Sequence, residues 1–282
     1  MMTKTDLQSW LEAARKQLVG DNQNTSFELY SITSYILERP KEWILTHGDI
    51  ILPNEIHREL DSCLDRLLKG EPLPYITGRQ SFYGLDFFVN QDVLIPRPET
   101  ELLVENAIEW LTLHPDRREQ IDVGTGSGII PITLADRFPD LHSTAIDVSD
   151  TALKVAAANI SKFYLEPSIT LLHNDLLNGL TITSDLITAN LPYIPQERLP
   201  SLRVSNFEPK VALDGGEQGF ELLRKLLSQL PSHLLPGGLA LLEIDYYQKD
   251  LSIEVATNFF PSAKITVLND LADLPRLLRI QA

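Results

Sequence analysis

The sequence predicts an α/β fold in which a small N-terminal helical bundle precedes a seven-stranded, mostly parallel, doubly wound sheet. Two observations lead to this prediction. Over the first 72 residues, apolar side chains recur at helical spacing only. From residue 99 onwards, short apolar runs alternate with amphipathic segments, which is the pattern of parallel strands joined by helices. The 282 residues are enough for two domains, each with its own core.

Composition and charge restrict the class of protein further. Hydrophobic residues make up 43% of the chain and charged residues 22%, as in soluble globular proteins. The net charge of −15 argues against direct binding to nucleic acid, because such binding depends on Lys and Arg that neutralise phosphates. A protein partner with a basic surface remains compatible with this charge.

Three features of the chain bear on its location. Residues Met1 to Trp10 are polar where a signal peptide is apolar, and no apolar run is long enough to span a membrane. Cys63 is the single cysteine, which excludes an intrachain disulfide and fits a reducing compartment. We therefore expect a cytoplasmic protein that does not bind membranes.

Residues 1–72 are expected to form the helical bundle, which by analogy with other two-domain enzymes recognises the partner. Cys63 is interpreted as a small buried hydrophobe. His47 and His57 stand apart without the spacing of metal ligands, so no metal site is expected. The expected helices and their ends are 5–18 with Thr5 or Asp6 as cap, 25–38, and 54–69 closed by Gly70.

Residues 73–98 are expected to connect the bundle to the sheet domain. Prolines at 72 and 74 predict a linker, and the residues on either side of Gly84 predict a β-hairpin. Pro96 and Pro98 hold the next segment extended, with Arg97 fixed between them. Thr100 is expected to cap a helix over 101–111. The stiff segment is either a rigid linker or one wall of a ligand crevice.

The sheet domain, residues 99–282, begins with a motif for close approach of a ligand. A strand over 120–123 runs directly into a glycine-rich turn and a helix over 129–138. Glycines let a ligand come close to the backbone, and the spacing Gly-x-Gly-x-Gly differs from the longer dinucleotide fingerprint. The turn consists of Gly124, Thr125, Gly126, Ser127 and Gly128.

Acidic residues are associated with the ends of the next two predicted strands. Asp147 closes the strand over 142–146 and can accept hydrogen bonds from both ribose hydroxyls. A helix over 150–162 follows. Asp175, after the strand over 169–172, either meets an adenine amino group or caps the next turn.

The fourth strand, 184–188, leads into Ala189-Asn190-Leu191-Pro192-Tyr193-Ile194. An Asn side chain offers a carbonyl acceptor and an NH₂ donor, Pro192 stiffens the turn, and Tyr193 can supply a flat wall. Such a turn can hold a planar group that bears N–H donors; the alternative is a strand-ending turn with a core tyrosine. Four strand ends with polar or glycine residues indicate a nucleoside site. Because the chain lacks a Lys-containing phosphate loop, the ligand expected there is S-adenosylmethionine.

The C-terminal third is expected to complete the sheet. Glu208, in the loop Phe207-Glu208-Pro209, either supports a substrate loop or forms a surface ion pair. Gly215 and Gly216 are expected to serve a backbone turn before the next helix. The expected elements are helices over 217–229 and 247–259 and strands over 239–244, 265–268 and 276–280, the last two antiparallel.

Several of these segments together resemble the class I, Rossmann-like methyltransferases, and more narrowly the protein-(glutamine-N5) methyltransferases of peptide chain release factors. The resemblance is close over residues 70–282. The Ile-Pro-Arg-Pro-Glu-Thr-Glu segment separates it from DNA amino-methyltransferases with a similar Asn turn. Leu191 stands where the family turn, Asn-Pro-Pro-Tyr, has its first proline. The matching segments are Glu71-Pro72, Tyr75 to Gly78, Phe82, Leu94 to Glu101, Asp122 to Gly128, Asn190 to Ile194, Phe207-Glu208-Pro209, and Leu213 to Gly216 with Gly219.

The resemblance implies an enzyme that methylates the glutamine of the Gly-Gly-Gln loop in a release factor, the protein of translation termination, using S-adenosylmethionine. It implies cofactor binding by the glycine-rich turn, Asp147, Asp175 and Asn190. We expect the side-chain oxygen of Asn190 and the carbonyl of Leu191 to accept hydrogen bonds from the two N–H groups of the substrate amide. The residues expected to bind substrate or act in catalysis are Asn190, Leu191, Pro192, Tyr193, Arg97 and Glu208.

Two other functions remain open at the level of sequence. One is an amino methyltransferase that acts on nucleic acid at adenine N6, which the acidic charge disfavours. The other is a catalytically idle module that binds a partner through the helical bundle, which the presence of Asn190, Pro192 and Tyr193 disfavours.

Overall fold

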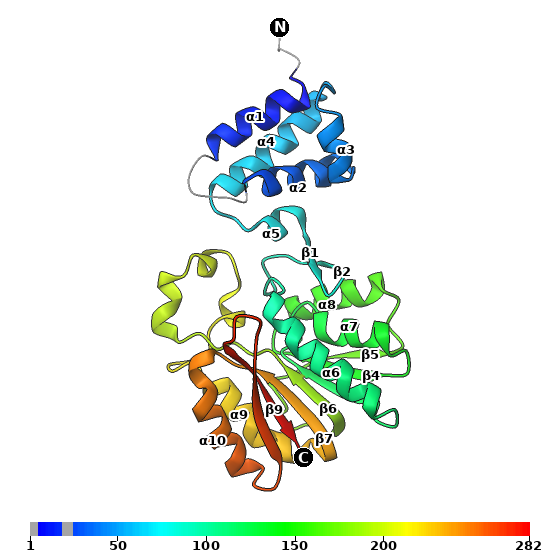
Figure 1. Cartoon of the computed structure of the whole chain (residues 1–282), viewed down its shortest axis with the longest axis vertical. Coiled ribbons are helices and arrows are strands. Elements are labelled where there is room, and N and C mark those ends of the chain that lie inside the picture. The colour runs from blue at the N-terminus through cyan, green and yellow to red at the C-terminus, as the bar shows by residue number, and fades with distance from the viewer. Residues whose placement is uncertain (1–4, 19–24) are drawn as a thin grey trace. The chain divides into compact units, whose positions relative to one another are not determined.

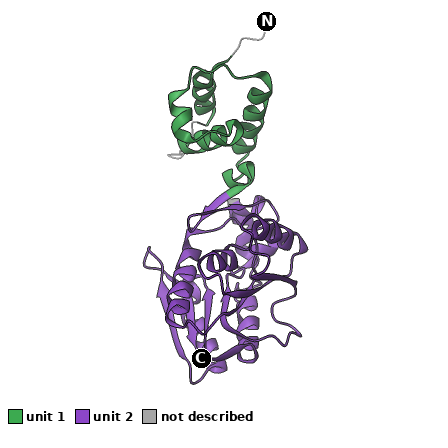
Figure 2. Cartoon of the chain, turned by 90° about the vertical axis from the view of Figure 1, so that its right-hand side faces the viewer, with its two compact units in different colours: residues 1–79 green, residues 80–282 purple. Residues whose placement is uncertain are grey.

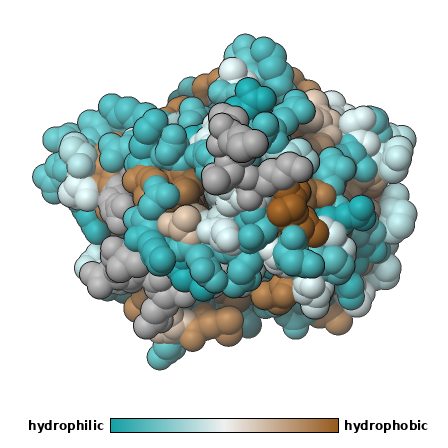
Figure 3. Space-filling view, turned by 90° about the horizontal axis from the view of Figure 1, so that it is seen from above, coloured by the Kyte–Doolittle hydropathy of each residue, from teal (hydrophilic) through white to brown (hydrophobic). Residues whose placement is uncertain are grey.

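The computed structural model describes residues 5–18 and 25–282. The chain divides into two compact units, residues 1–79 and 80–282, coloured separately in Figure 2. No described helix is both long enough and apolar enough to cross a membrane. The face of the molecule shown in Figure 3 is mostly hydrophilic, with hydrophobic residues in separate patches.

The described part of unit 1 is helical, with one apolar core. Asp6 caps the first helix by accepting a hydrogen bond from the Ser9 backbone N–H. Trp10 is buried in the core, and its ring N–H donates to Asp61 at 2.8 Å. Cys63 packs against this core as predicted but is half-buried rather than fully buried. The helices are α1 (Leu7–Gln17), α2 (Thr25–Leu37), α3 (Lys41–Thr46), α4 (Asn54–Leu68) and α5 (Leu73–Thr77).

Two of these helices were not predicted, and the expected linker at Pro72 and Pro74 is wrong. Helix α5 starts after Pro72 and has Pro74 in its first turn, where a proline's missing N–H costs nothing. Arg66 holds the start of this segment through two hydrogen bonds to the carboxylate of Glu71, at 2.8 and 2.6 Å. Here the two prolines mark the start of a short helix rather than a linker.

Residues 80–282, all of which the structure describes, contain the predicted seven-stranded sheet, in the order β5-β4-β3-β6-β7-β9-β8. Neighbours from β5 to β7 are parallel, and β9 is antiparallel to both β7 and β8, as predicted. The strands are β3 (Glu119–Val123), β4 (His142–Asp147), β5 (Ile169–His173), β6 (Ser184–Ala189), β7 (Leu234–Glu243), β8 (Lys264–Asn269) and β9 (Pro275–Gln281).

Helices cover both faces of this sheet (Figure 1). Because side chains alternate along a strand, Leu186 and Leu239 face one apolar core while Ile187 and Ala240 face the other. The first core includes residues of α6 (Glu101–Leu113), α7 (Ile129–Arg137) and α8 (Asp150–Lys162), and the second includes residues of α9 (Glu221–Gln229) and α10 (Lys249–Phe259). The doubly wound prediction is confirmed.

The predicted hairpin is confirmed as β1 (Arg79–Phe82) and β2 (Leu85–Phe88). The buried amide of Asn159 on α8 accepts from the Phe88 N–H at 2.7 Å and donates to the Phe88 carbonyl at 3.0 Å. The same NH₂ group donates to the carbonyl of Ser127 at 2.8 Å. One side chain therefore fixes the hairpin and the glycine-rich turn to each other.

Two element starts differ from prediction. Helix α9 starts at Glu221 rather than 217, because Gly219 is left-handed and Glu221 accepts hydrogen bonds from the Gln218 and Phe220 N–H groups. Strand β7 starts at Leu234 rather than 239, so the predicted turn at 236–238 lies within the strand, beside a register shift in its pairing with β6.

Candidate active site

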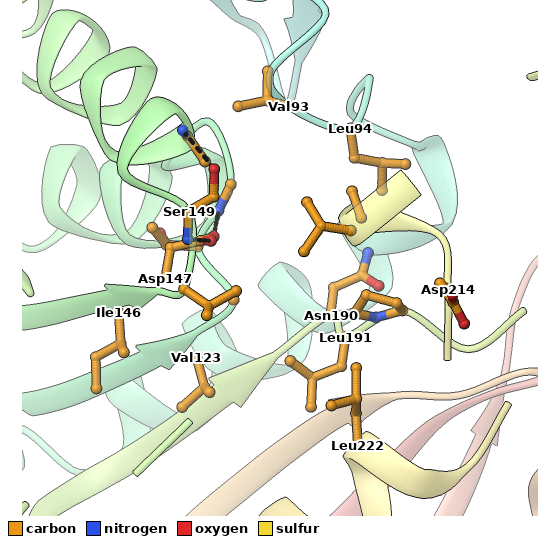
Figure 4. A pocket seen from close by; sticks show the side chains of 18 of the residues that line it. Val93, Leu94, Val123, Ile146, Asp147, Ser149, Asn190, Leu191, Asp214 and Leu222 are labelled. Carbon is orange, nitrogen blue, oxygen red and sulfur yellow. Dashed lines mark hydrogen bonds between the residues drawn. The ribbon is translucent and has the colours of Figure 1, made fainter. Parts of the chain in front are cut away.

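A cavity of about 700 Å³ lies at the carboxyl edge of the parallel strands. Loops that follow β3, β4, β5 and β6 line it, as the four polar strand ends predicted. Residues 92–94, 96 and 97, before the short 3₁₀ turn Pro98–Thr100, add another wall, so the stiff segment does border the crevice. Figure 4 shows Asp147 and Ser149 across the cavity from Asn190.

The glycine-rich turn after β3 has the backbone that its sequence requires. Gly124, Gly126 and Gly128 all have positive φ angles, which favour glycine. The N–H groups of Gly124 and Thr125 both donate to the Ile146 carbonyl on β4, at 2.8 and 2.9 Å. Among the described residues, nothing lies within 4 Å of where a Cβ on Gly126 would be, so a ligand can approach this backbone.

Asp147, at the end of β4, lines the cavity. Its two carboxylate oxygens accept from the Gly126 N–H at 2.8 Å and the Ser149 N–H at 2.9 Å. Burial raises the pKa of Asp147, and these two backbone hydrogen bonds oppose that effect. Each oxygen retains a further acceptor site, so the structure is compatible with the predicted ribose contact.

Asp175 also lines the cavity, after β5. Its Oδ2 pairs with Nζ of Lys225 at 2.6 Å and accepts from the Asn178 side chain at 2.9 Å. The Asn178 N–H donates to the Asp175 carbonyl, which closes a local turn. Asp175 thus takes part in the turn through its backbone carbonyl and through a side-chain bond to Asn178, and an adenine contact remains a prediction.

The Asn turn follows β6 at the centre of the cavity lining. The NH₂ group of Asn190 donates to Oγ1 of Thr100 at 3.0 Å, and that hydroxyl donates to Oε2 of Glu243 at 2.8 Å. Leu191, which replaces the family proline, is buried and belongs to the apolar core beneath the turn. A Cβ on Gly124 would lie 2.9 Å from Leu191 Cδ2, so the leucine fills space that this glycine leaves.

A second loop holds the Asn turn from behind. The Ile194 N–H donates to the Leu213 carbonyl at 3.1 Å, and the Gly215 N–H donates to the Ile194 carbonyl at 2.9 Å. A Cβ on Gly215 would lie 2.7 Å from Cα of Tyr193, so only glycine fits. The prediction that Gly215 serves the backbone is confirmed, with a close approach as its cause.

Tyr193 does not lie among the residues that line the cavity, although it was expected to form a wall. Burial raises the pKa of its hydroxyl, and the negative charge of Glu243 adds to this effect. Its contact with a substrate therefore remains a prediction.

Arg97 and Glu208 come together from distant parts of the chain, with Arg97 Nη2 and Glu208 Oε1 2.6 Å apart. Glu208 is 4% exposed, so the alternative of a surface ion pair is wrong. Burial raises the pKa of Glu208, and the guanidinium of Arg97 lowers it. Arg97 lines the cavity whereas Glu208 does not, so Glu208 orients Arg97.

Sequence reasoning missed the partners of Asn190. Thr100 was expected to cap α6, but its side chain makes no cap hydrogen bond and is fully buried between Asn190 and Glu243. A short 3₁₀ turn precedes α6 and removes the need for that cap. Glu243 had a readable signal, because an acidic residue at the carboxyl end of an apolar strand lies at the ligand edge of the sheet.

Comparisons with known proteins place both units in one family. The model of the Methyltransferase small domain matches residues 98–205, and that of the PrmC N-terminal domain matches residues 9–78. The release factor glutamine methyltransferase of Koribacter versatilis is 35% identical over 277 residues, which cover 96% of this chain and 97% of the relative. That of Moorella thermoacetica is 45% identical over 236 residues, or 83% of each chain.

The fold also occurs in more distant solved structures. The hMettl16 catalytic domain in complex with MAT2A 3'UTR hairpin 6 has a TM-score of 0.55 and 17% identity, over 81% of this chain and 82% of that one. At this identity the likeness concerns the fold alone. The fold and the family relatives agree, and the chain belongs to the family of release factor glutamine methyltransferases.

Proposed function

We propose that this enzyme transfers a methyl group from S-adenosylmethionine to the side-chain amide nitrogen of a glutamine in a peptide chain release factor. The proposed substrate is the glutamine of the Gly-Gly-Gln loop, and the proposed location is the cytoplasm, where release factors act. The observation that carries the proposal is Asn190. Its NH₂ group donates to Thr100, and none of the residues that the structure describes donates to its oxygen, which is left to accept from a substrate amide.

The cofactor is assigned to the part of the cavity between the glycine-rich turn and Asp147. Gly126 leaves its backbone open to a ligand, and Asp147 presents a carboxylate to the cavity for hydroxyl donors. We also assign Asp175 to this part of the cavity. When bound, S-adenosylmethionine supplies an electrophilic methyl group.

The substrate amide is assigned to the Asn turn. An amide nitrogen is a poor nucleophile, because its lone pair is delocalised into the carbonyl group. Asn190 Oδ1 and the Leu191 carbonyl oxygen each accept a hydrogen bond from one of its two N–H groups, which fixes the position of the nitrogen. Positioning of this kind lowers a barrier by several kcal/mol, about 7 or more in the best intramolecular systems. Two acceptors also favour the positive charge that develops on nitrogen, which then loses one of its two protons to solvent and becomes the neutral methylated amide. We assign Arg97, held by Glu208, to the substrate side.

Methyl-labelled S-adenosylmethionine tests the proposal. The enzyme is incubated separately with release factor, with a release factor in which the loop glutamine is alanine, and with DNA. We expect label only in the unaltered release factor. Label in DNA would instead support an amino methyltransferase of nucleic acid, and no label anywhere would support an idle binding module.

A further inference from the structure

Three chain segments meet in one buried hydrogen-bonded row behind the Asn turn. Asn190 follows β6, Thr100 ends the 3₁₀ turn before α6, and Glu243 ends β7. Thr100 is 0% exposed and Glu243 is 3% exposed. Thr100 and Asn190 both belong to the lining of the cavity, whereas Glu243 does not. Glu243 therefore acts on a substrate through its neighbours, and the hydrogen bonds from Asn190 to Thr100 and from Thr100 to Glu243 connect it to the cavity.

The chemistry of the row fixes which end of the Asn190 amide faces the cavity. An ionised carboxylate accepts hydrogen bonds but cannot donate. Thr100 therefore gives its one hydroxyl hydrogen to Glu243, over the observed 2.8 Å. The Thr100 oxygen is left as an acceptor, so the side chain beside it must donate. Asn190 does so through its NH₂ group at 3.0 Å, and its oxygen points the other way.

We propose that Glu243 is a positioning residue, which acts through Thr100 to keep the oxygen of the Asn190 amide turned toward the substrate amide. The inference rests on the proposed function, in which that oxygen accepts a substrate N–H bond. It assigns a role to a carboxylate that touches neither ligand. It also assigns a role to Thr100 of the Pro-Glu-Thr-Glu segment beyond its position before a helix.

Protonation of Glu243 removes the constraint on this arrangement. A carboxylic acid can donate to Thr100 as well as accept from it, so the Thr100 hydroxyl hydrogen can also point at Asn190 and the flipped amide becomes accessible. Groups on several elements act on the charge of Glu243: Glu99 and Thr100 before α6, Tyr193 of the Asn turn, and Arg276 on β9. Burial raises the pKa of Glu243 to about 7, although Arg276, Thr100 and Tyr193 oppose this effect. Methylation should therefore decline as the pH falls through neutrality.

Replacing the carboxylate by its neutral isostere tests the inference. For Glu243→Gln we expect kcat for release factor to fall by about tenfold or more, the effect of losing one hydrogen bond. The decline of kcat at acidic pH should also disappear, and the dissociation constant of S-adenosylmethionine should stay within about twofold. Glu254→Gln, on the exposed face of α10, is the matched control and should retain the wild-type profile.

The outcomes separate this inference from the proposed function. An inactive wild-type enzyme refutes the function itself. An active wild-type enzyme with an equally active Glu243→Gln variant, and the same pH profile in both, refutes the role of Glu243. If Glu243→Gln does not fold, the variants Thr100→Ser and Thr100→Val test the inference instead. Activity that Thr100→Ser retains and Thr100→Val loses supports the hydrogen-bonded row. Equal activity in the two variants overturns it.

Discussion

At the scale of single residues, the account depends on the amide of Asn190. Its NH₂ group is bound by Thr100 and its oxygen is available in the cavity. The neighbouring acceptor, the carbonyl of Leu191, belongs to the backbone and survives the replacement of the family proline. The leucine side chain is buried in the core beneath the turn, so its packing stabilises the turn.

Removing the Asn190 side-chain acceptor should affect turnover more than cofactor binding. For Asn190→Ala we expect kcat to fall by roughly 100-fold or more, the magnitude seen when one preorganised hydrogen-bonding group at a reacting centre is removed. The dissociation constant of S-adenosylmethionine, measured by calorimetry, should change far less. A variant that methylates release factor at near wild-type rate would exclude Asn190 from this role.

The raised pKa of Glu243 also predicts an effect on stability. Its folded pKa of about 7 exceeds the ordinary value of 4.5, so the native state binds the proton more tightly than the unfolded chain. This contribution to stability is present below about pH 4.5 and is lost as the pH rises through about 7. Glu243→Gln should therefore raise the melting temperature at pH 8 by several degrees. The expected scale is roughly 2–4 °C for each kcal/mol gained in the free energy of unfolding.

The comparison across pH supplies the control for this prediction. At pH 5 the wild-type carboxyl is protonated and resembles glutamine, so the two melting temperatures should converge. Burial raises the pKa of Asp122 to about 6. Because Asp122 is present in both proteins, its effect on the melting temperature cancels in the comparison. The same difference in melting temperature at pH 5 and pH 8 would mean that Glu243 is not the titrating group.

At the scale of elements, the Asn turn is positioned by the loop behind it. Gly215→Ala places a Cβ 2.7 Å from Tyr193 Cα and 2.8 Å from the Pro192 carbonyl oxygen, so the turn must move. Because displacement of about 1 Å can lower a rate by roughly 100-fold, we expect a loss of that order in kcat. Initial rates with release factor give the measurement.

Gly179→Ala is the matched control for that substitution. Gly179 has a positive φ angle, but among the described residues nothing lies within 4 Å of its added Cβ. Alanine there should lower stability by about 1 kcal/mol through backbone strain and leave kcat unchanged. Equal losses of activity in the two variants would show that close approach at Gly215 is not what places the turn.

The elements also show what sequence patterns can and cannot predict. All seven strands and the glycine-rich turn were predictable, because each strand contains a short run rich in apolar residues and alternate glycines mark a sharp turn. The partner of Thr100 was not predictable, because Thr100 and Glu243 are 143 positions apart. Likewise, nothing local to Asn159 predicts that it joins the hairpin to Ser127.

At the scale of the whole molecule, the cavity is confined to one unit. Every residue that lines it lies between 92 and 222, within unit 2. Unit 1 has its own core around Trp10 and Leu60 and matches a family domain of its own. The cavity, and with it the proposed chemistry and cofactor binding, therefore lies in unit 2, and we propose that unit 1 recognises the release factor.

Deleting residues 1–79 should separate these two tasks. If the truncated chain folds, as a cooperative thermal transition would show, its affinity for S-adenosylmethionine should match that of the full chain. The KM for intact release factor should rise by at least about tenfold, the loss of roughly 1.4 kcal/mol of binding. An unchanged KM would remove the recognition role from unit 1.

The most direct test of the central claim is the structure of the enzyme with release factor and a non-reactive analogue of S-adenosylmethionine. The account predicts that Oδ1 of Asn190 lies about 2.9 Å from the nitrogen of the substrate glutamine amide, with the Leu191 carbonyl as its second acceptor. If Asn190 instead faces away from that amide, or if its NH₂ group rather than its oxygen faces the substrate nitrogen, the account is contradicted.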